Sequence, residues 1–177
     1  MEVSRKRTGT EQQFFDLTKK IVELECGYKL YDMEYVSGSS TLRVFIMDDK
    51  TKTAVIEDCV KVDRGFTPYC ETEAWIPEDF VLEVSSPGMY RELKSIQHFE
   101  WAQGELVLVK LDPHKLEGEL RERLKEMGAL TSLSLRAKVS GILPSAVKLE
   151  VDSEDLEIPF EVIKKANLDP DVDPYKE

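Results

Sequence analysis

The sequence has no long hydrophobic run, and none approaches the roughly 20 apolar residues that a membrane-spanning helix needs. The basic start, Arg5-Lys6-Arg7, is not followed by the apolar segment of a signal peptide. We therefore expect a cytoplasmic protein with no membrane partner. With 41% hydrophobic and 33% charged residues, the 177-residue chain is typical of a globular protein of one domain or two small ones.

Cysteine and histidine are scarce. Cys26, Cys59 and Cys70 are odd in number and far apart, so they do not indicate a disulfide framework. Together with His98 and His114 they form no pair at the spacing of zinc ligands. We expect no metal and no other cofactor.

Motifs of catalysis and nucleotide binding are also missing. No G-x-S-x-G segment surrounds Ser85 or Ser86, and His98 alone does not make a triad with them. Neither G-x-x-x-x-G-K-[ST] nor G-x-G-x-x-G occurs. The sequence therefore predicts a protein that is not an enzyme and has no small-molecule substrate.

Positive charge is in the minority, with 24 Lys and Arg against 35 Asp and Glu, a net charge of −11. Attraction to phosphate backbones is then not the main source of binding energy, whereas a basic protein would be attracted. One acidic run stands out because no basic residue interrupts positions 149–163. From the residues alone it is either a solvated hairpin tip or a binding surface for a basic partner. Its candidate residues are Glu150, Asp152, Glu154, Asp155 and Glu157.

The first half of the chain predicts the order helix, strand, strand, helix, strand. An apolar stripe of Phe14, Leu17, Ile21 and Leu24 predicts a helix over 10–26 that stops at Gly27. Strands are expected at 30–36, 41–47 and 80–84, the second with Leu42, Val44 and Ile46 on one face. This order is typical of an α+β sandwich.

The second helix is expected to begin near Ile56 and to end early. Val55 stands where a capping hydroxyl is usual, while Glu57 and Asp58 suit the positive first turn. Gly65 and Pro68 are expected to break the helix. Residues 65–79 are therefore the least defined part of this half.

Short strands dominate the second half, at 105–111, 134–143, 146–151 and 156–160, and they favour a small barrel. Leu116, Leu120, Leu124 and Met127 predict an inserted helix of about three or four turns within 113–133. That helix either covers the open end of the barrel or docks a partner. We expect residues 1–9 to be flexible and the acidic, proline-bearing segment 169–177 to be disordered.

The segment from Phe80 to Leu93 combines a strand, a Pro-Gly turn and an arginine. Two hydroxyls, the turn amides and a guanidinium could converge there and hold an anion or a peptide carbonyl. The candidate residues are Ser85, Ser86, Gly88 and Arg91. Alternatively, the serines are simply polar turn residues, and Arg91 pairs with Glu83 or Glu92 and only braces the two domains.

The stretch LEVSSPGMYRELKSIQHFEWAQGELVLVKL, residues 82–111, resembles the signature of the RimP family of ribosome maturation factors. Tyr31–Val36, Leu42–Ile46 and Glu57–Cys59 are similar to earlier segments of that family, and Ile158–Phe160 with Ile163–Leu168 is similar to its closing segment. The resemblance covers most of residues 10–168 in family order.

The resemblance implies two domains: a KH-like α-β-β-α-β sandwich over 1–98 and an SH3-like (Sm-like) barrel over 99–168. It implies a factor that performs no catalysis and binds immature small ribosomal subunits through a basic ribosomal protein near the decoding region, alone or together with adjacent rRNA. The G-x-x-G loop with which KH domains clamp RNA is absent. The alternative is a general RNA-binding module of KH-like and Sm-like parts, which the net charge of −11 disfavours.

Overall fold

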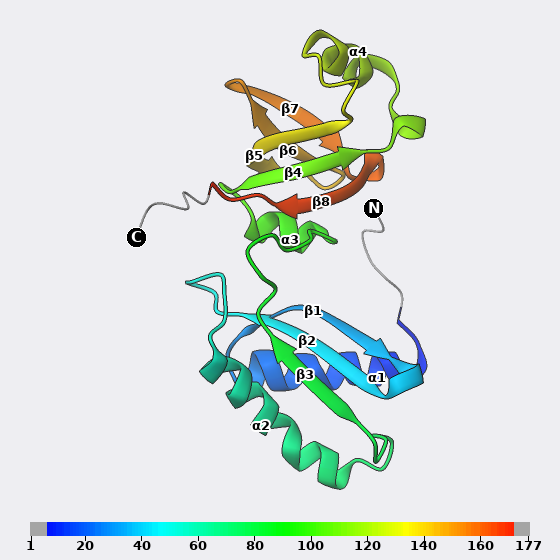
Figure 1. The fold of residues 1–177 in the computed structure, drawn as a ribbon, viewed down its shortest axis with the longest axis vertical. Helices are drawn as coiled ribbons and strands as arrows, with labels where there is room; N and C mark the ends of the chain where they lie inside the picture. The colour runs from blue at the N-terminus through cyan, green and yellow to red at the C-terminus, as the bar shows by residue number, and fades with distance from the viewer. Residues whose placement is uncertain (1–6, 172–177) are drawn as a thin grey trace. The chain divides into compact units, whose positions relative to one another are not determined.

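The computed structural model describes residues 7–171, which form two compact units (Figure 1). The first unit ends at Gly88 and the second begins at Met89. Each has a hydrophobic core of its own. Helices and strands occur in both units, which confirms the predicted α+β class. Within 7–171, no helix has the length and apolar character needed to cross a bilayer.

The first unit packs two long helical segments against a three-stranded sheet (Figure 1). The strand order is β1-β2-β3, with β1 and β2 antiparallel and β2 and β3 parallel. β3 is therefore an edge strand. The elements are α1 (Gly9–Lys19), the π-helical η1 (Lys20–Glu25), β1 (Lys29–Val36), the 3-10 turn η2 (Ser37–Ser39), β2 (Thr41–Met47), α2 (Ile56–Thr72) and β3 (Val81–Ser85).

The core of the first unit lies between this sheet and the helices. Leu42, Val44 and Ile46 are fully buried on one face of the central strand, as their alternation predicted. Phe14 of α1 is also fully buried, and its ring stacks on the Phe80 ring at a centroid distance of 5.2 Å. Burying such a large aromatic side chain is a dominant source of hydrophobic stabilisation.

The stripe predicted for the first helix is wrong at its last member, since Leu24 is 82% exposed. The helix changes from α to π geometry at Lys20. A π turn holds more residues than an α turn, so side chains beyond it rotate away from the stripe that an α spacing predicts. Ile21 and Val22 face the core instead.

The predicted early end of the second helix is also wrong, because α2 runs through Gly65 and Pro68 to Thr72. Because Gly65 has no side chain, α2 can pack closely against η1 there. A Cβ at this position would lie only 2.7 Å from Ile21 Cγ2. Pro68 is exposed, and water can satisfy the carbonyl that its missing N–H leaves unpaired. Tertiary packing thus outweighs local helix propensity in this segment.

The second unit is built on a five-stranded antiparallel sheet of order β7-β6-β5-β4-β8. Its core is lined by alternate strand residues such as Val107, Val109, Val147 and Leu149. The elements are α3 (Ile96–Trp101), β4 (Leu106–Leu111), the 3-10 turn η3 (Pro113–Lys115), α4 (Gly118–Glu126), β5 (Ser134–Ile142), β6 (Ala146–Val151), β7 (Glu154–Pro159), the 3-10 turn η4 (Phe160–Val162) and β8 (Ile163–Leu168).

Strand β8 was not predicted. Its pairing with β4 shifts register between Lys110 and Leu111, so the buried residues Ile163 and Ala166 are not at strand spacing. Among the described residues, β7 and β8 are edge strands with no pairing between them. The antiparallel sheet is therefore present, and its closure into a barrel stays a prediction.

Helix α4 lies where the inserted helix was expected, but its nine residues make only about two and a half turns. Leu116 and Leu124 are buried in the core of the second unit.

Near the C-terminus, Asp169 and Asp171 are held by Arg136 of β5, which donates a hydrogen bond to each carboxylate. Two expectations concern the ends of the chain: flexibility of residues 1–9 and disorder of residues 169–177. Residues 1–6 and 172–177 lie outside the described residues.

Candidate binding surfaces

The predicted serine-proline-glycine segment begins at the end of strand β3. Ser85 is its last, exposed residue, and Ser86 follows half-buried. Gly88 has a φ of +79°, the left-handed conformation that the Pro-Gly turn requires. Neither serine hydroxyl forms a hydrogen bond with the residues that the structure describes. Arg91 belongs to the second unit, so convergence of all four residues on one ligand stays a prediction.

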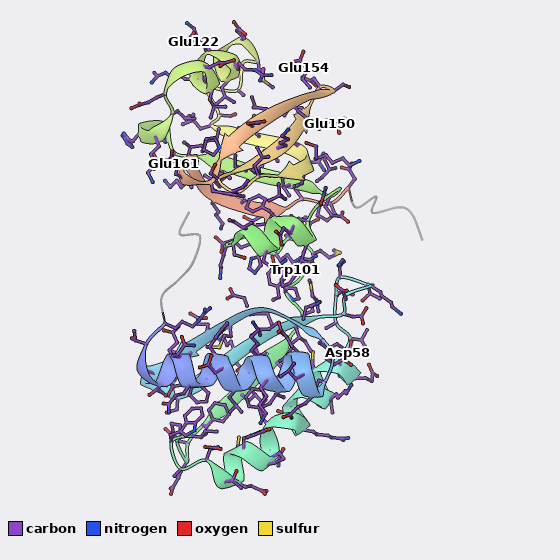
Figure 2. All side chains as sticks on the ribbon, turned by 180° about the vertical axis from the view of Figure 1, so that it is seen from behind. Asp58, Trp101, Glu122, Glu150, Glu154 and Glu161 are labelled. Carbon is purple, nitrogen blue, oxygen red and sulfur yellow. The ribbon has the colours of Figure 1, made fainter. Side chains whose placement is uncertain are left out.

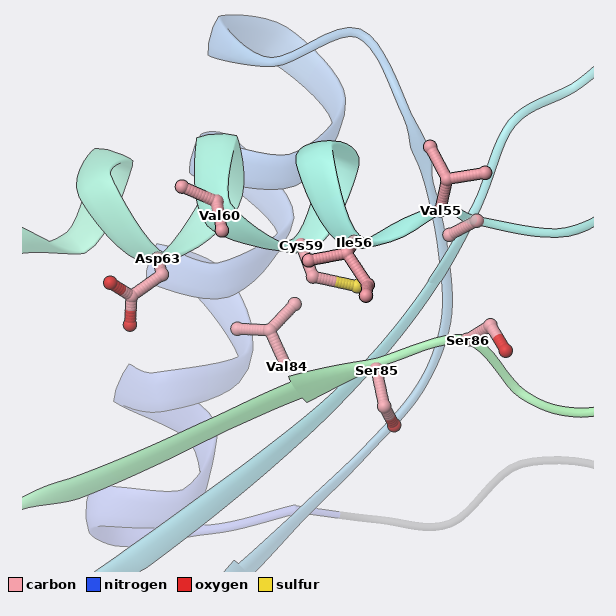
Figure 3. A pocket seen from close by; sticks show the side chains of 9 residues that line it. Val55, Ile56, Cys59, Val60, Asp63, Val84, Ser85 and Ser86 are labelled. Atoms are coloured by element: carbon pink, nitrogen blue, oxygen red, sulfur yellow. The ribbon is translucent and has the colours of Figure 1, made fainter.

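Ser85 and Ser86 line a pocket of about 480 Å³ between β3 and the first turns of α2 (Figure 3). The view shows Val84 pointing toward α2, whereas Ser85 points to the other face of the strand. We call this pocket the α2–β3 groove. Its lining is mostly aliphatic with a single carboxylate: Ala54, Val55, Ile56, Cys59, Val60, Asp63, Val84, Ser85 and Ser86.

The aliphatic wall of the α2–β3 groove is unusually exposed. Ile56 is 78% exposed, Val55 56% and Val60 40%. Single exposed aliphatic residues are common, but three within six positions form a contiguous apolar surface. Such a surface is typical of a site that another molecule covers.

The start of α2 is held by Asp58, which replaces the missing capping hydroxyl. Its Oδ2 accepts a hydrogen bond from the Val55 N–H at 3.0 Å, and its Oδ1 accepts one from the Tyr28 hydroxyl at 2.6 Å. The bond to the carboxylate, with a smaller effect of burial, raises the pKa of Tyr28 to about 12. The apolar residues at the helix start are thus displayed on a fixed backbone.

Arg91 lies in a short stretch that pairs with strand β8. Its carbonyl oxygen accepts a hydrogen bond from the Leu168 N–H at 3.0 Å, and Glu92 bridges Asn167. The suggested partner Glu83 instead accepts a 2.8 Å hydrogen bond from Arg43 Nε. The backbone of Arg91 is therefore anchored within the second unit.

The predicted acidic residues lie on the β6–β7 hairpin, where all five are exposed. Figure 2 shows Glu150 and Glu154 extending outward from the ribbon. Glu150 and Asp155 are directly opposite each other in the strand register, so two like charges share one face. The tip, Asp152 and Ser153, has φ values of 51° and 69°.

Two cations reduce this negative charge in part. Lys148 Nζ lies 3.5 Å from Glu157 Oε1, and Arg123 of α4 lies 3.5 Å from Glu154 Oε2. Both pairs are largely exposed, so each contributes little to stability. Glu150, Asp152 and Asp155 form no ion pair within residues 7–171. The hairpin therefore retains uncompensated negative charge.

The titratable residues show no catalytic arrangement in the described part of the chain. His98 is buried, and its Nδ1 accepts the Lys94 N–H at 3.0 Å while its ring stacks on Trp101, so it braces its own loop. Burial raises the pKa of Cys59, and the nearby Asp58 charge adds to the effect, which keeps the thiol protonated. Residues 7–171 contain no group of three metal-ligating side chains.

Sequence reasoning missed the apolar half of the α2–β3 groove. In the sequence, Val55 indicates only a poor cap and Ile56 only the first residue of a helix. The available signal was the aliphatic run Ala54-Val55-Ile56 at a helix start, where polar residues are the rule. The spacing Ile56, Val60 and Asp63 places these three on one helix face.

Comparison with known protein families identifies the first unit. Residues 17–90 match the model of the RimP N-terminal domain. The match spans the end of α1, η1, α2, the three strands and the serine-proline-glycine segment of that unit. The resemblance inferred from sequence motifs is thereby confirmed for this part of the chain.

Proposed function

We propose that this protein, whose residues 17–90 are a RimP N-terminal domain, is a ribosome maturation factor that binds immature small ribosomal subunits. The family match is the observation that carries the proposal. The family is one of assembly factors that do not catalyse reactions, and we propose that this chain likewise performs no reaction and acts in the cytoplasm.

The second unit is proposed to be an SH3-like barrel that contacts a basic ribosomal protein near the decoding region. Its five antiparallel strands and the register shifts in β4–β8 and β5–β6 support this, because bulges give a sheet the curvature that closure needs. The acidic β6–β7 hairpin supplies the charge for a basic partner. The residues proposed to bind there are Glu150, Asp152, Glu154, Asp155 and Glu157.

We also propose that Ser85, Ser86, Gly88 and Arg91 contribute to binding of the particle. The exposure of Ser85 and the lack of a hydrogen bond from either serine hydroxyl within residues 7–171 support a contact role for Ser85 and Ser86. Because Arg91 is anchored through its backbone carbonyl, Arg91→Ala should preserve the pairing with β8 and weaken particle association.

Sedimentation tests the proposal directly. The purified protein is mixed with immature small subunits, mature small subunits, intact ribosomes or naked rRNA, and each mixture is centrifuged. We expect selective co-sedimentation with immature small subunits. Binding to naked RNA without preference for a particle, steeply weakened by salt, would instead identify a general RNA-binding module.

A charge-reversal pair tests the acidic hairpin. Glu150→Lys with Asp155→Lys should weaken particle binding at least tenfold. The matched control is Glu119→Lys with Glu126→Lys on α4, which makes the same change in net charge at exposed positions outside the hairpin. Equal losses in both variants would show that net charge, rather than the hairpin, drives binding.

A further inference from the structure

The α2–β3 groove combines two unsatisfied features, an open strand edge and an exposed aliphatic wall. We propose that it binds an extended, basic segment of another protein, which adds as a fourth strand beside β3. This inference rests on the proposed function, because it identifies a second kind of contact with the particle. It concerns a surface distinct from the acidic hairpin.

The open edge follows from the backbone of β3. Val81 donates its N–H to the Ser40 carbonyl on the β2 side at 3.0 Å. Because backbone groups alternate along a strand, Leu82 and Val84 direct their N–H and C=O groups to the opposite side. No strand of the described chain pairs with β3 there. Each of the two residues therefore offers one donor and one acceptor to an added strand.

The wall of the groove matches the side-chain spacing of a strand. Ile56 and Val60 are one helical turn apart, about 6 Å along α2. Alternate residues of an extended segment that face the same side are about 6.6 Å apart. Two aliphatic side chains of an added strand can therefore contact Ile56 and Val60 in succession.

The charge that lines the groove favours a basic occupant, although Lys61 and Arg64 line a neighbouring hollow that shares Ile56 and Val60. Asp63 is the one charged residue that lines the groove, and within residues 7–171 it forms no ion pair. It lies about 5 Å beyond Val60 along the helix, within reach of a Lys or Arg that follows the aliphatic residues. A phosphate backbone would meet this carboxylate and an aliphatic wall, so RNA is disfavoured.

A second copy of this chain is a poorer occupant. Pairing of two β3 edges would bring together two Asp63 carboxylates and two chains that each carry a net charge of −11. β3 also lacks the lysines and prolines that commonly protect edge strands. The edge is thus suited to a partner of opposite charge.

Photo-crosslinking identifies what occupies the groove. Ile56 is replaced by benzoylphenylalanine, the protein is bound to immature small subunits and irradiated, and the crosslinked peptide is sequenced by mass spectrometry. We expect a protein segment with aliphatic residues and a nearby Lys or Arg. A crosslink to rRNA, to a second copy of this chain or to no component of a bound particle would overturn the inference.

Substitutions then test affinity. Val60→Glu and Asp63→Lys should each weaken binding of the particle at least fivefold. Glu71→Lys on the same helix makes the same charge change as Asp63→Lys but lies outside the groove, so it should leave affinity within twofold. Equal losses for both lysine variants, or unchanged binding for both groove variants, would refute the groove as a contact.

Amide exchange tests strand addition. A synthetic peptide with the crosslinked sequence should slow exchange of the Leu82 and Val84 amides at least tenfold, while the Glu83 amide, which faces β2, stays protected throughout. Unchanged exchange at Leu82 and Val84 would exclude an added strand. If wild-type protein fails to sediment with any particle, the proposed function itself fails, an outcome distinct from binding that is insensitive to the groove variants.

Discussion

The edge strands β7 and β3 differ in how well they are protected from pairing with another strand. In the second unit, edge strand β7 carries Glu154, Asp155 and Glu157, all exposed, which discourages pairing with another strand. In the first unit, edge strand β3 has one acidic residue, Glu83, and Arg43 neutralises it. The comparison shows that the second unit suits charge-mediated encounter, while the first leaves backbone groups open to a partner.

The two sheets also differ in how their exposed charges are paired across strands. Arg43 on the central strand of the first sheet lies between Glu34 and Glu83, at 3.3 and 2.8 Å. On the second sheet, Glu150 faces Asp155 in register. One sheet balances its exposed charges across strands and the other keeps like charges together, as expected of a surface that another molecule neutralises.

The largest expected effect tests whether the two cores are separate. Phe14→Ala should destabilise the first unit by about 3–5 kcal/mol, because it removes a fully buried ring that contacts Tyr35 and Phe80. The chain has two tryptophans, Trp75 in the first unit and Trp101 in the second. In a Trp101→Phe background, urea unfolding is followed by Trp75 fluorescence. Phe14→Ala should lower the urea midpoint relative to the same background with Phe14.

The control for this comparison is Phe160→Ala, which should lower only the midpoint that Trp101 reports in a Trp75→Phe background. Phe160 is 2% exposed in the core of the second unit. If either substitution shifted both tryptophan signals equally, the chain would unfold as one cooperative body.

The next effect concerns the close contact between α2 and η1 at Gly65 and Ile21. Gly65→Ala should destabilise the first unit by about 1–3 kcal/mol, because the new Cβ would overlap Ile21 Cγ2. In an Ile21→Ala background the same change should stabilise by up to about 1 kcal/mol through helix propensity. Thermal unfolding of the wild type, the two single variants and the double variant measures the coupling, and additive effects would contradict it.

A smaller effect concerns the cap of α2. Tyr28→Phe removes the bond to Asp58 and should cost about 1.5 kcal/mol at neutral pH. Since the pKa of Tyr28 is raised to about 12 in the folded protein from about 10 in the unfolded chain, this stabilisation is complete below pH 10 and is lost as the pH rises to 12. Absorbance titration should show a tyrosine ionising near pH 12 that Tyr28→Phe removes.

The smallest expected effect has opposite signs for stability and function. Asp155→Asn relieves the repulsion with Glu150 and should stabilise the second unit by about 0.2–1 kcal/mol. The same change should weaken particle binding. Thermal unfolding and sedimentation measure the two effects, with Glu126→Gln on α4 as a control for loss of one negative charge. A variant that loses both stability and binding would count against a functional role for the repulsive pair.

Much of the fold was predictable because local patterns and packing agree. The alternation of Leu42, Val44 and Ile46 predicted β2, and Ser95 accepts the His98 N–H at 3.2 Å at the start of α3, as a capping serine does. Prediction failed where packing overrides propensity. Gly65 signalled a helix end by itself, but in the structure its small size allows a close helix contact.

The candidate site was only half predictable for a related reason. Ser85 and Gly88 belong to a local motif that sequence reading can find. The aliphatic wall of the groove comes from a helix more than twenty residues earlier, and its exposure depends on how α2 lies against β3. No local pattern in a single sequence indicates how α2 packs against β3.

The close approach at Gly65 has a consequence for diversity among related proteins. α2 packs on Ile21 at that point, so a larger residue at Gly65 would push the helix outward and alter the dimensions of the α2–β3 groove. Two chains with identical groove residues could then accept different segments. Differences in the partner segments that such chains bind should be sought at Gly65 and Ile21 as well as among the residues that line the groove.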